Sequence, residues 1–394
     1  MNKDLKFPPK FLWGASTSAY QVEGGNNNDW SKWLDAGRAC DHYHLYEQDF
    51  DLIKELGQNA HRFSLEWSRI EPEEGKFNKK EINHYRDVLL ALRKRNIKSV
   101  VTLWHFTNPL WFAQKGGWAN KKAADYFKRY VKIVTENFGD LIDFWATLNE
   151  PTVFIGMGYL RGIWPPGKTN PFLAWKVLKN LIKAHKAAYE IIHQYYPYAQ
   201  VTLNQLIGYV EPARRWCPVE VFIAKIIHYF SNSFLLNKVK NYLDFIGFDY
   251  YLHYRIVWYP PFVKDINKKR SDVGWEIYPK GIYFVLKYLA RFKKPIYVLE
   301  NGLADADDSR RAAFIVDHLK WIHRAISEGI DVRGYFHWSL MDNFEWAEGF
   351  APRFGLVEIN YKSLKRKIRP SAYLYAKICK ANAIEGDILN SKKQ

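Results

Sequence analysis

Cysteine is scarce in this chain, with three residues among 394, at positions 40, 217 and 379. They are widely spaced, odd in number and part of no CxxC pair, which argues against both a disulfide framework and a zinc site. We therefore expect a reducing compartment, the cytoplasm, and no bound metal.

Long hydrophobic runs are missing as well. The first residues, MNKDLKFPPKF, lack the apolar stretch of a signal peptide, and no run of about 18 apolar residues could span a bilayer. A phosphate-cradling GxxxxGK pattern is also missing. The sequence thus predicts no membrane partner and no nucleotide or other cofactor.

Acidic residues are outnumbered by basic ones, 41 against 58, which gives a formal net charge of +17. Such an excess can mark a nucleic-acid-binding protein when it is gathered on one face. Here the basic residues are dispersed, with short clusters at 268–270, 293–294 and 365–367. This dispersal favours an ordinary solvated surface and no nucleic-acid partner.

Aromatic residues are abundant, at 17% of the chain, within an apolar fraction of 48%. That apolar fraction suffices for a large core. Aromatic rings also suit ligands that combine C–H patches with hydroxyl groups, as sugars do.

Short β-rich apolar runs alternate with longer amphipathic stretches along the chain, which is typical of a parallel sheet with helical crossovers. Six helical patterns are expected at 45–56, 80–95, 122–138, 171–196, 279–291 and 310–327. The expected strands are 11–16, 60–65, 99–104, 144–149, 200–206, 245–251, 296–300 and 332–338. Eight units predict an α/β fold, a single-domain (β/α)8 TIM barrel over residues 1–384, followed by a frayed polar tail at 385–394.

Several expected strands end in polar or aromatic residues. The ends include His105, Asn149-Glu150, Asp249 and Glu300-Asn301. Because the carboxyl ends of barrel strands meet at one mouth, where active sites lie, these side chains should converge. Two glutamates across one mouth, among aromatic rings, are what glycoside hydrolysis requires.

Five segments carry a family resemblance. They are FLWGASTSAYQVEG, NAHRFSLEWSRI, TLNEP, YVLENGLAD and HWSLMDNFEWAEGFAPRFGL, in this order between residues 11 and 356. Together they resemble glycoside hydrolase family 1, the β-glucosidase family. The resemblance implies a retaining β-glycosidase with a small-molecule β-glycoside substrate.

The resemblance also implies roles for single residues. Glu150 matches the acid/base of the family and Glu300 its nucleophile, and Arg62 and Tyr251 match the residues that hold the nucleophile. The expected sugar-binding residues are Gln21, His105, Asn149, Trp338, Glu345 and Trp346. Of these, Glu345 favours unphosphorylated sugars, because its carboxylate would repel a phosphate.

The chain departs from the family pattern in places. Asp249 stands where asparagine is usual, Phe106 follows His105 where tryptophan is common, and Thr107-Asn108-Pro109 replaces Asp-Leu-Pro. The chain is also short for the family, with the shortfall between about Tyr229 and Asp244. We expect an unusual pH dependence from Asp249 and weaker hydrogen-exchange protection at residues 210–275.

Two alternatives stay open beside an active exo-acting enzyme that accepts β-glucosides, β-galactosides and β-fucosides. One is a carbohydrate-binding barrel with little or no hydrolytic activity, and the other is a basic surface that associates with nucleic acid. The preferred sugar, the aglycone, the pH optimum and the oligomeric state also stay open at the level of sequence.

Overall fold

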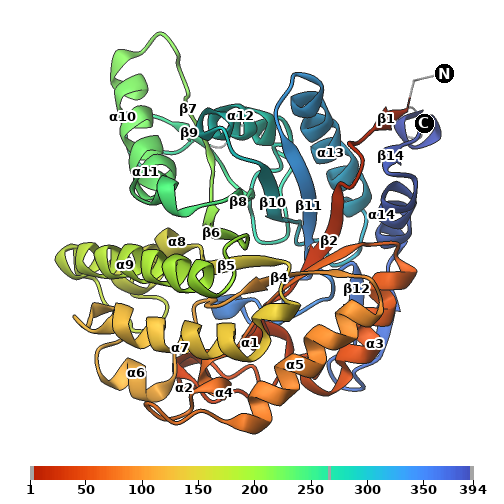
Figure 1. Ribbon diagram of the computed structural model, residues 1–394. Coiled ribbons are helices and arrows are strands. Elements are labelled where there is room, and N and C mark those ends of the chain that lie inside the picture. The colour runs from red at the N-terminus through yellow and green to blue at the C-terminus, as the bar shows by residue number, and fades with distance from the viewer. Residues whose placement is uncertain (1–3, 265–267, 391–394) are drawn as a thin grey trace.

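The chain forms a closed parallel barrel in the computed structural model, which describes residues 4–264 and 268–390 (Figure 1). The strands pair in the closed order β10-β11-β2-β3-β4-β5-β6-β8. They are β2 Leu12–Ser16, β3 Ala60–Ser64, β4 Lys98–Thr102, β5 Phe144–Asn149, β6 Gln200–Leu206, β8 Ile246–Asp249, β10 Ile296–Asn301 and β11 Val332–Trp338. The predicted (β/α)8 barrel is confirmed.

Amphipathic helices surround the barrel. In α7 the apolar residues Phe127, Tyr130, Val131, Val134 and Phe138 are buried, at the three- and four-residue spacing that places them on one face. The long outer helices are α3 His42–Glu55, α5 Lys79–Lys94, α7 Ala123–Phe138, α9 Pro171–Tyr195, α12 Lys280–Leu289, α13 Arg311–Ser327 and α14 Pro370–Ala381. The six predicted helices each correspond to one of these.

Short elements complete the chain at the barrel ends. The short helices are α1 Ala19–Val22, α2 Asp29–Trp33, α4 Trp67–Ile70, α6 Leu110–Gln114 and α8 Pro151–Ile155. The additional short strands are β1 Leu5–Lys6, β7 Tyr209–Pro212, β9 His253–Ile256, β12 Val357–Ile359, β13 Arg366–Ile368 and β14 Ala383–Ile384.

The barrel interior is apolar toward the amino ends of its strands and polar at the mouth, where the strands have their carboxyl ends. An interior cluster contains Ala60, Val100, Phe245, Tyr297, Leu299 and Phe336. Gly247 packs against this cluster, where a Cβ atom would meet Leu299 Cδ1 at 2.5 Å. The apolar plug leaves the carboxyl ends of the strands free to present polar groups to a ligand.

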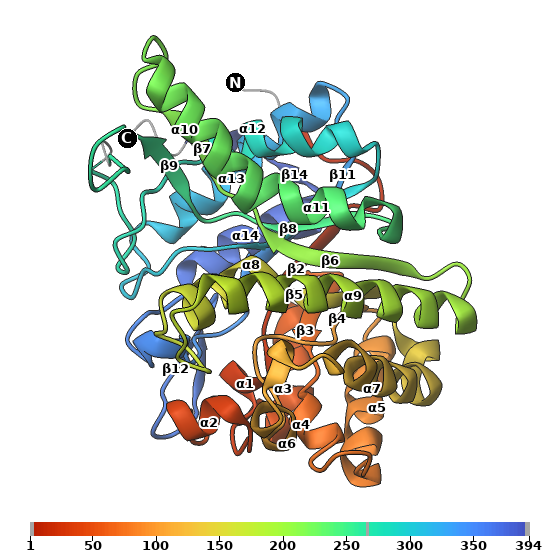
Figure 2. The same ribbon diagram turned by 90° about the vertical axis from the view of Figure 1, so that its left-hand side faces the viewer.

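The stretch before β8, where the sequence predicts a shortening, is helical. It comprises α10 Pro218–His228, a wider turn at Tyr229–Ser233, α11 Phe234–Val239 and a final turn at Lys240–Tyr242. Figures 1 and 2 show α10 projecting from the barrel beside β7 and β9. Among the described residues, Pro218–Tyr242 is the one helical stretch long and apolar enough to cross a membrane by length and composition alone, and 33% of its most apolar window is buried. The stretch contains Glu220, Lys225, Lys238 and Lys240 and is not an uninterrupted apolar run, so the expectation of no membrane partner stays a prediction.

The end of the chain differs from its prediction. Residues Gly386–Asn390 form a short helix, α15, whose first backbone N–H donates to Asp4 Oδ1 at 2.9 Å. Just before it, β14 pairs with β1. The predicted frayed tail is thus wrong for residues 386–390, because these contacts to the N-terminal segment order them. Residues 391–394 lie outside the described part.

Candidate active site

The carboxyl ends of the strands bring the predicted site residues to one cavity of about 480 Å³. Eight of the ten predicted residues line it: His105, Asn149, Glu150, Tyr251, Glu300, Trp338, Glu345 and Trp346. The other two, Gln21 on α1 and Arg62 on β3, are fully buried behind this wall. Both contact residues of the cavity, so the predicted set forms one site.

Three carboxylates meet at the floor of this cavity. Glu150, Asp249 and Glu300 each place one oxygen within 4.8 Å of the other two, and all three side chains are buried. Glu150 follows β5 directly and adopts a left-handed backbone conformation with φ of 40°. Its backbone N–H donates to Asn204 O at 2.9 Å, which fixes the turn that directs the side chain.

Arg62 and Tyr251 hold Glu300 from two sides. The Arg62 guanidinium donates from Nη1 to Glu300 Oε1, and the Tyr251 hydroxyl donates to Oε2 at 2.9 Å. Burial raises the pKa of Glu300, while the charge and hydrogen bond of Arg62 and the hydrogen bond of Tyr251 oppose that rise. The arrangement stabilises an ionised carboxylate. Because Arg62 already neutralises Glu300, a cation is not needed to hold the carboxylates together.

Glu150 has the opposite surroundings. Burial raises its pKa well above the ordinary value, and the nearby Asp249 and Glu300 carboxylates raise it further. Asp249 also has a raised pKa, first through burial and then through the charge of Glu300. The hydrogen bond between Glu150 and Asp249 raises the pKa of Glu150 and lowers that of Asp249, which favours the proton on Glu150. Glu150 therefore keeps its proton to higher pH than an exposed glutamate does.

Hydrogen bonds orient the Asn149 amide. Its Oδ1 accepts from Arg62 Nη2 at 2.6 Å and from Asn204 Nδ2 at 2.7 Å, so its Nδ2 turns toward His105 Nε2 at 3.0 Å. Burial holds the pKa of His105 well below the usual range, so the ring is neutral. With Nε2 as acceptor, Nδ1 carries the proton, and this buried atom has no partner among the described residues.

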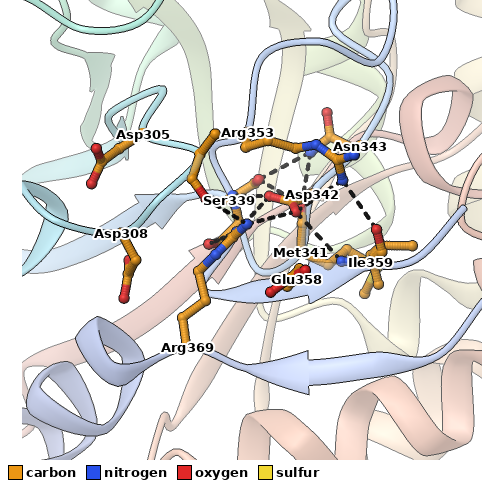
Figure 3. A network of polar contacts seen from close by, with 12 residues as sticks. Asp305, Asp308, Ser339, Met341, Asp342, Asn343, Arg353, Glu358, Ile359 and Arg369 are labelled. Atoms are coloured by element: carbon orange, nitrogen blue, oxygen red, sulfur yellow. Dashed lines mark hydrogen bonds and ion pairs between the residues drawn. The ribbon is translucent and has the colours of Figure 1, made fainter.

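The loop after β11 carries Glu345 and Trp346. Its anchor is Asp342, which is fully buried (Figure 3). Asp342 Oδ1 accepts from Arg369 Nη1 at 2.7 Å and from the Gly355 backbone at 3.0 Å, and Oδ2 accepts from Arg353 Nη1 at 3.2 Å. The paired charges and hydrogen bonds compensate for burying the carboxylate and hold the loop in place.

Gln21 connects this loop to the barrel. Its amide Nε2 donates to Phe344 O at 2.7 Å and to Asn343 Oδ1 at 3.1 Å, and lies 3.4 Å from Glu345 Oε2. Burial and the charge of Glu300 raise the pKa of Glu345 to about 8. Trp338 and Trp346 each lie nearly parallel to the His105 ring, at 6.1 and 5.9 Å between ring centroids.

Sequence reasoning missed the supports of this site. Asn204, near the end of β6, donates from Nδ2 to both Asn149 and Asp249. Arg353 and Arg369 hold Asp342 from later in the chain. The available signal for Asn204 was a polar residue near the end of an apolar strand. The two arginines carried no such signal, because their partner is set only by the folded chain.

A closed barrel with two buried glutamates at an aromatic mouth, one held by an arginine and a tyrosine and the other beside a third carboxylate, is the arrangement of a glycoside hydrolase. The model of glycosyl hydrolase family 1 matches residues 3–241 and 236–384. β-Glucosidase A of Thermotoga maritima is 33% identical over 442 residues, covering 96% of this chain and 99% of the relative. The β-galactosidase of Saccharolobus solfataricus is 31% identical, with 98% of each protein covered.

A solved structure of a β-glycosidase has the same fold. The β-glycosidase from Pyrococcus horikoshii superposes with a TM-score of 0.93 at 40% identity, covering 98% of each chain. This chain belongs to glycosyl hydrolase family 1. The two segments matched by the family model meet at residues 236–241, inside the stretch where the sequence predicts a shortening.

Proposed function

We propose that this enzyme is a retaining β-glycosidase that releases the terminal sugar from the nonreducing end of unphosphorylated β-glucosides, and also of β-galactosides and β-fucosides. The observation that carries the proposal is the buried pair of Glu150 and Glu300, with oxygens within 4.8 Å. Carboxyl groups about 5 Å apart favour a covalent intermediate, whereas inverting enzymes need about 6.5–9.5 Å to admit a water between them. The names of the β-glucosidase and β-galactosidase relatives support the substrate class.

In this proposal Glu300 is the nucleophile. One of its oxygens attacks the anomeric carbon as the bond from that carbon to the leaving oxygen breaks, giving a glycosyl ester with inverted configuration. Arg62 and the Tyr251 hydroxyl keep the carboxylate ionised and oriented before the attack. The negative charge of Glu300 is lost when the ester forms.

Glu150 is the acid/base. It donates its proton to the leaving oxygen in the first step and removes a proton from the attacking water in the second. Loss of the Glu300 charge removes one cause of the raised pKa of Glu150, so Glu150 becomes easier to ionise when a base is needed. Asp249 keeps its place beside Glu150 in both steps, so part of the shift persists.

The remaining cavity residues bind the sugar. Asn149, next to the acid/base, is placed to contact the 2-hydroxyl, and the neutral His105 ring beside it also lines the cavity. Glu345 forms hydrogen bonds with hydroxyl groups, and as a carboxyl group it offers no positive charge to a phosphate substituent. Trp338 provides an apolar face for the C–H patches of the ring.

A carbohydrate-binding barrel without hydrolysis is the second candidate. Binding alone needs neither an arginine and a tyrosine on Glu300 nor a glutamate with a strongly raised pKa. Both features are costly to build in a buried site, and both serve the two chemical steps. The contacts of Glu300 and the raised pKa of Glu150 therefore favour a hydrolytic enzyme over a barrel that only binds carbohydrate.

Azide rescue tests the assignment of the two glutamates. Glu150→Ala and Glu300→Ala are each assayed on an aryl β-glycoside with azide as an external nucleophile. Glu150→Ala keeps the covalent intermediate and should yield a β-glycosyl azide, whereas Glu300→Ala should yield an α-glycosyl azide. Exposed Glu348→Ala, on the same loop as Glu345, is the control and should hydrolyse normally without azide. The same anomer from both variants would contradict the roles.

A further inference from the structure

Helix α10 turns its apolar residues toward solvent. The residues it buries are Glu220 and Ala224, whereas Val219, Phe222 and Ile226 are exposed. These three recur at helical spacing and lie on one face. A surface helix ordinarily packs such a face against the core, whereas α10 packs Ala224 inward, half-buries Ile223 and Ile227, and leaves this second apolar face in solvent.

Further apolar residues extend this face on both sides. The exposed side chains next to α10 are Trp216, Tyr229 and Phe230, and those of the loop after β9 are Trp258, Tyr259 and Phe262. The exposed fractions of Trp216, Phe222 and Phe230 are 78%, 64% and 60%. The α10 patch is the name we give to Trp216, Val219, Phe222, Ile226, Tyr229, Phe230, Trp258, Tyr259 and Phe262.

Glu220 joins the two halves of the α10 patch. Its carboxylate accepts from the Arg214 backbone N–H at 2.8 Å, from Arg214 Nε at 3.0 Å, and from the backbone N–H of Trp258. The loop after β9 is therefore attached to the first turn of α10. Figure 2 shows both segments projecting together from the barrel.

The exposed charges around the α10 patch are positive. The cations that surround or interrupt it are Lys225, Lys264 and Arg215, whose side chain is 80% exposed although one guanidinium nitrogen lies 3.3 Å from Glu211 Oε2. Glu220 is the only acidic residue between positions 212 and 238, and it is buried and paired with Arg214. Exposed aromatic and aliphatic side chains flanked by cations are the composition of a membrane-interface segment.

We propose that the α10 patch docks this enzyme peripherally onto a lipid surface that carries anionic headgroups. The apolar side chains enter the boundary between headgroups and acyl chains, and the cations contact lipid phosphates. The stretch lies on the membrane and does not cross it, because α11 packs Leu235, Leu236 and Val239 into the protein. The proposal replaces the sequence-based expectation that no membrane partner exists.

A second copy of the chain fits the α10 patch less well than lipid does. Symmetric pairing of this face would bring Arg215, Lys225 and Lys264 toward the same cations of the other copy. The repulsion would oppose the apolar contact, whereas anionic headgroups would reinforce it.

Docking would also orient the active site. The α10 patch continues from β7 and β9, which follow the carboxyl ends of β6 and β8 at the barrel mouth. His253 on β9 connects these strands, because its Nε2 lies 3.1 Å from Glu211 Oε1 on β7. Its Nδ1 lies 2.8 Å from Glu276 Oε2. Leu252 and Tyr254 on the same segment line the cavity. The mouth thus lies on the side that meets the lipid, within reach of amphiphilic glycosides held there.

Vesicle sedimentation of the full-length protein tests the proposal. Phosphatidylglycerol vesicles should bind the protein, and phosphatidylcholine vesicles should bind it more weakly. The combined variant Trp216→Ser, Phe222→Ser and Phe230→Ser should lower the partition coefficient by about tenfold or more, because it removes inserted apolar area. The control variant Tyr198→Ser with Tyr373→Ser removes exposed rings elsewhere and should bind like the wild type.

A charge variant tests the electrostatic part. Arg215→Gln, Lys225→Gln and Lys264→Gln together should flatten the loss of binding between low salt and about 0.5 M NaCl. Unchanged hydrolysis of a soluble aryl β-glycoside shows that each variant is folded. Failure of the wild type to bind either vesicle, or an equal loss in the control, overturns the proposal. So does a dimer in sedimentation velocity that Phe222→Ser dissociates and that does not bind vesicles.

Discussion

Replacing Asp249 by asparagine tests how the third carboxylate sets the pH range of catalysis. In the free enzyme Glu150 must be protonated to donate, so its pKa sets the alkaline limb of kcat/KM. Asp249 raises that pKa by its charge and by accepting a hydrogen bond from the protonated Glu150 carboxyl group. Removing the charge should lower the pKa of Glu150 and move the alkaline limb to lower pH.

The size of the shift follows from the geometry. Two unit charges at 4.8 Å interact by about 3.5 kcal/mol at an effective dielectric constant of about 20, which corresponds to about 2.5 pH units. Asp249 itself has a raised pKa, so it is ionised over a narrower pH range, and the positive charge of Arg62 offsets part of its effect on Glu150. We therefore expect a downward shift of about 1–2 pH units.

The assay is a pH profile of kcat/KM on an aryl β-glucoside for the wild type and Asp249→Asn. Asp143→Asn is a suitable control, because Asp143 lies at the opposite end of β5 and pairs there with Lys98. An alkaline limb that stays in place or moves upward in Asp249→Asn would refute the reasoning.

The same variant has a stability consequence. Burial raises the pKa of folded Asp249 above its unfolded value, so the stability contributed by its protonated form is present at low pH and is lost as pH rises through the folded pKa. Asparagine does not ionise and avoids that loss. The Tm of Asp249→Asn relative to wild type should therefore be higher at pH 8 than at pH 4, and a constant difference would contradict this account.

Three further outcomes are expected. Tyr251→Phe should lower kcat by about ten- to a hundredfold in steady-state assays with little change in Tm, because it removes a charge-assisted hydrogen bond from Glu300. Asp342→Asn should destabilise the protein by about 3–5 kcal/mol in thermal or denaturant unfolding, because it leaves the Arg369 charge without its buried partner. Amides at residues 210–275 should exchange faster than those elsewhere around the barrel, and uniform protection would contradict the expected effect of the shortened stretch.

Matched variants separate specific from general effects. Tyr254→Phe also alters a cavity-lining tyrosine but leaves Glu300 untouched, and should change kcat far less than Tyr251→Phe. Asp331→Asn removes an exposed ion pair with Arg333 and should cost less than about 1 kcal/mol. Equal effects within either pair would show that the contacts with Glu300 and Arg369 are not the cause.

Much of the barrel could be predicted from the sequence because its signals are local. The strand that ends at Glu300 is a short apolar run, and the α7 stretch repeats its apolar residues every three or four positions. These periods depend only on backbone geometry. The site residues Glu150 and Glu300 were also predictable, since a carboxylate at the end of a buried strand is costly unless it serves a function.

The supports of the site could not be predicted in this way. Asp342 meets Arg369 27 positions later, and Asn204 joins Asn149 to Asp249 across three strands. Sequence shows that Asp249 is unusual, but its distance from Glu150 depends on the closure of the barrel. Pairings of this kind arise from long-range packing, which no local pattern encodes.

Helix α10 shows most clearly where prediction from sequence ends and the tertiary structure decides. Sequence by itself predicted the barrel helices by their local periodicity but not α10, since none of the six expected helical patterns lies between residues 196 and 279. Only the tertiary structure decided that Val219, Phe222 and Ile226 face outward while Glu220 is buried. Periodicity defines the faces of a helix, and the partners available in three dimensions decide which face the protein covers. For α10, Glu220 binds Arg214 and the Trp258 backbone, and the apolar face is left to the solvent side.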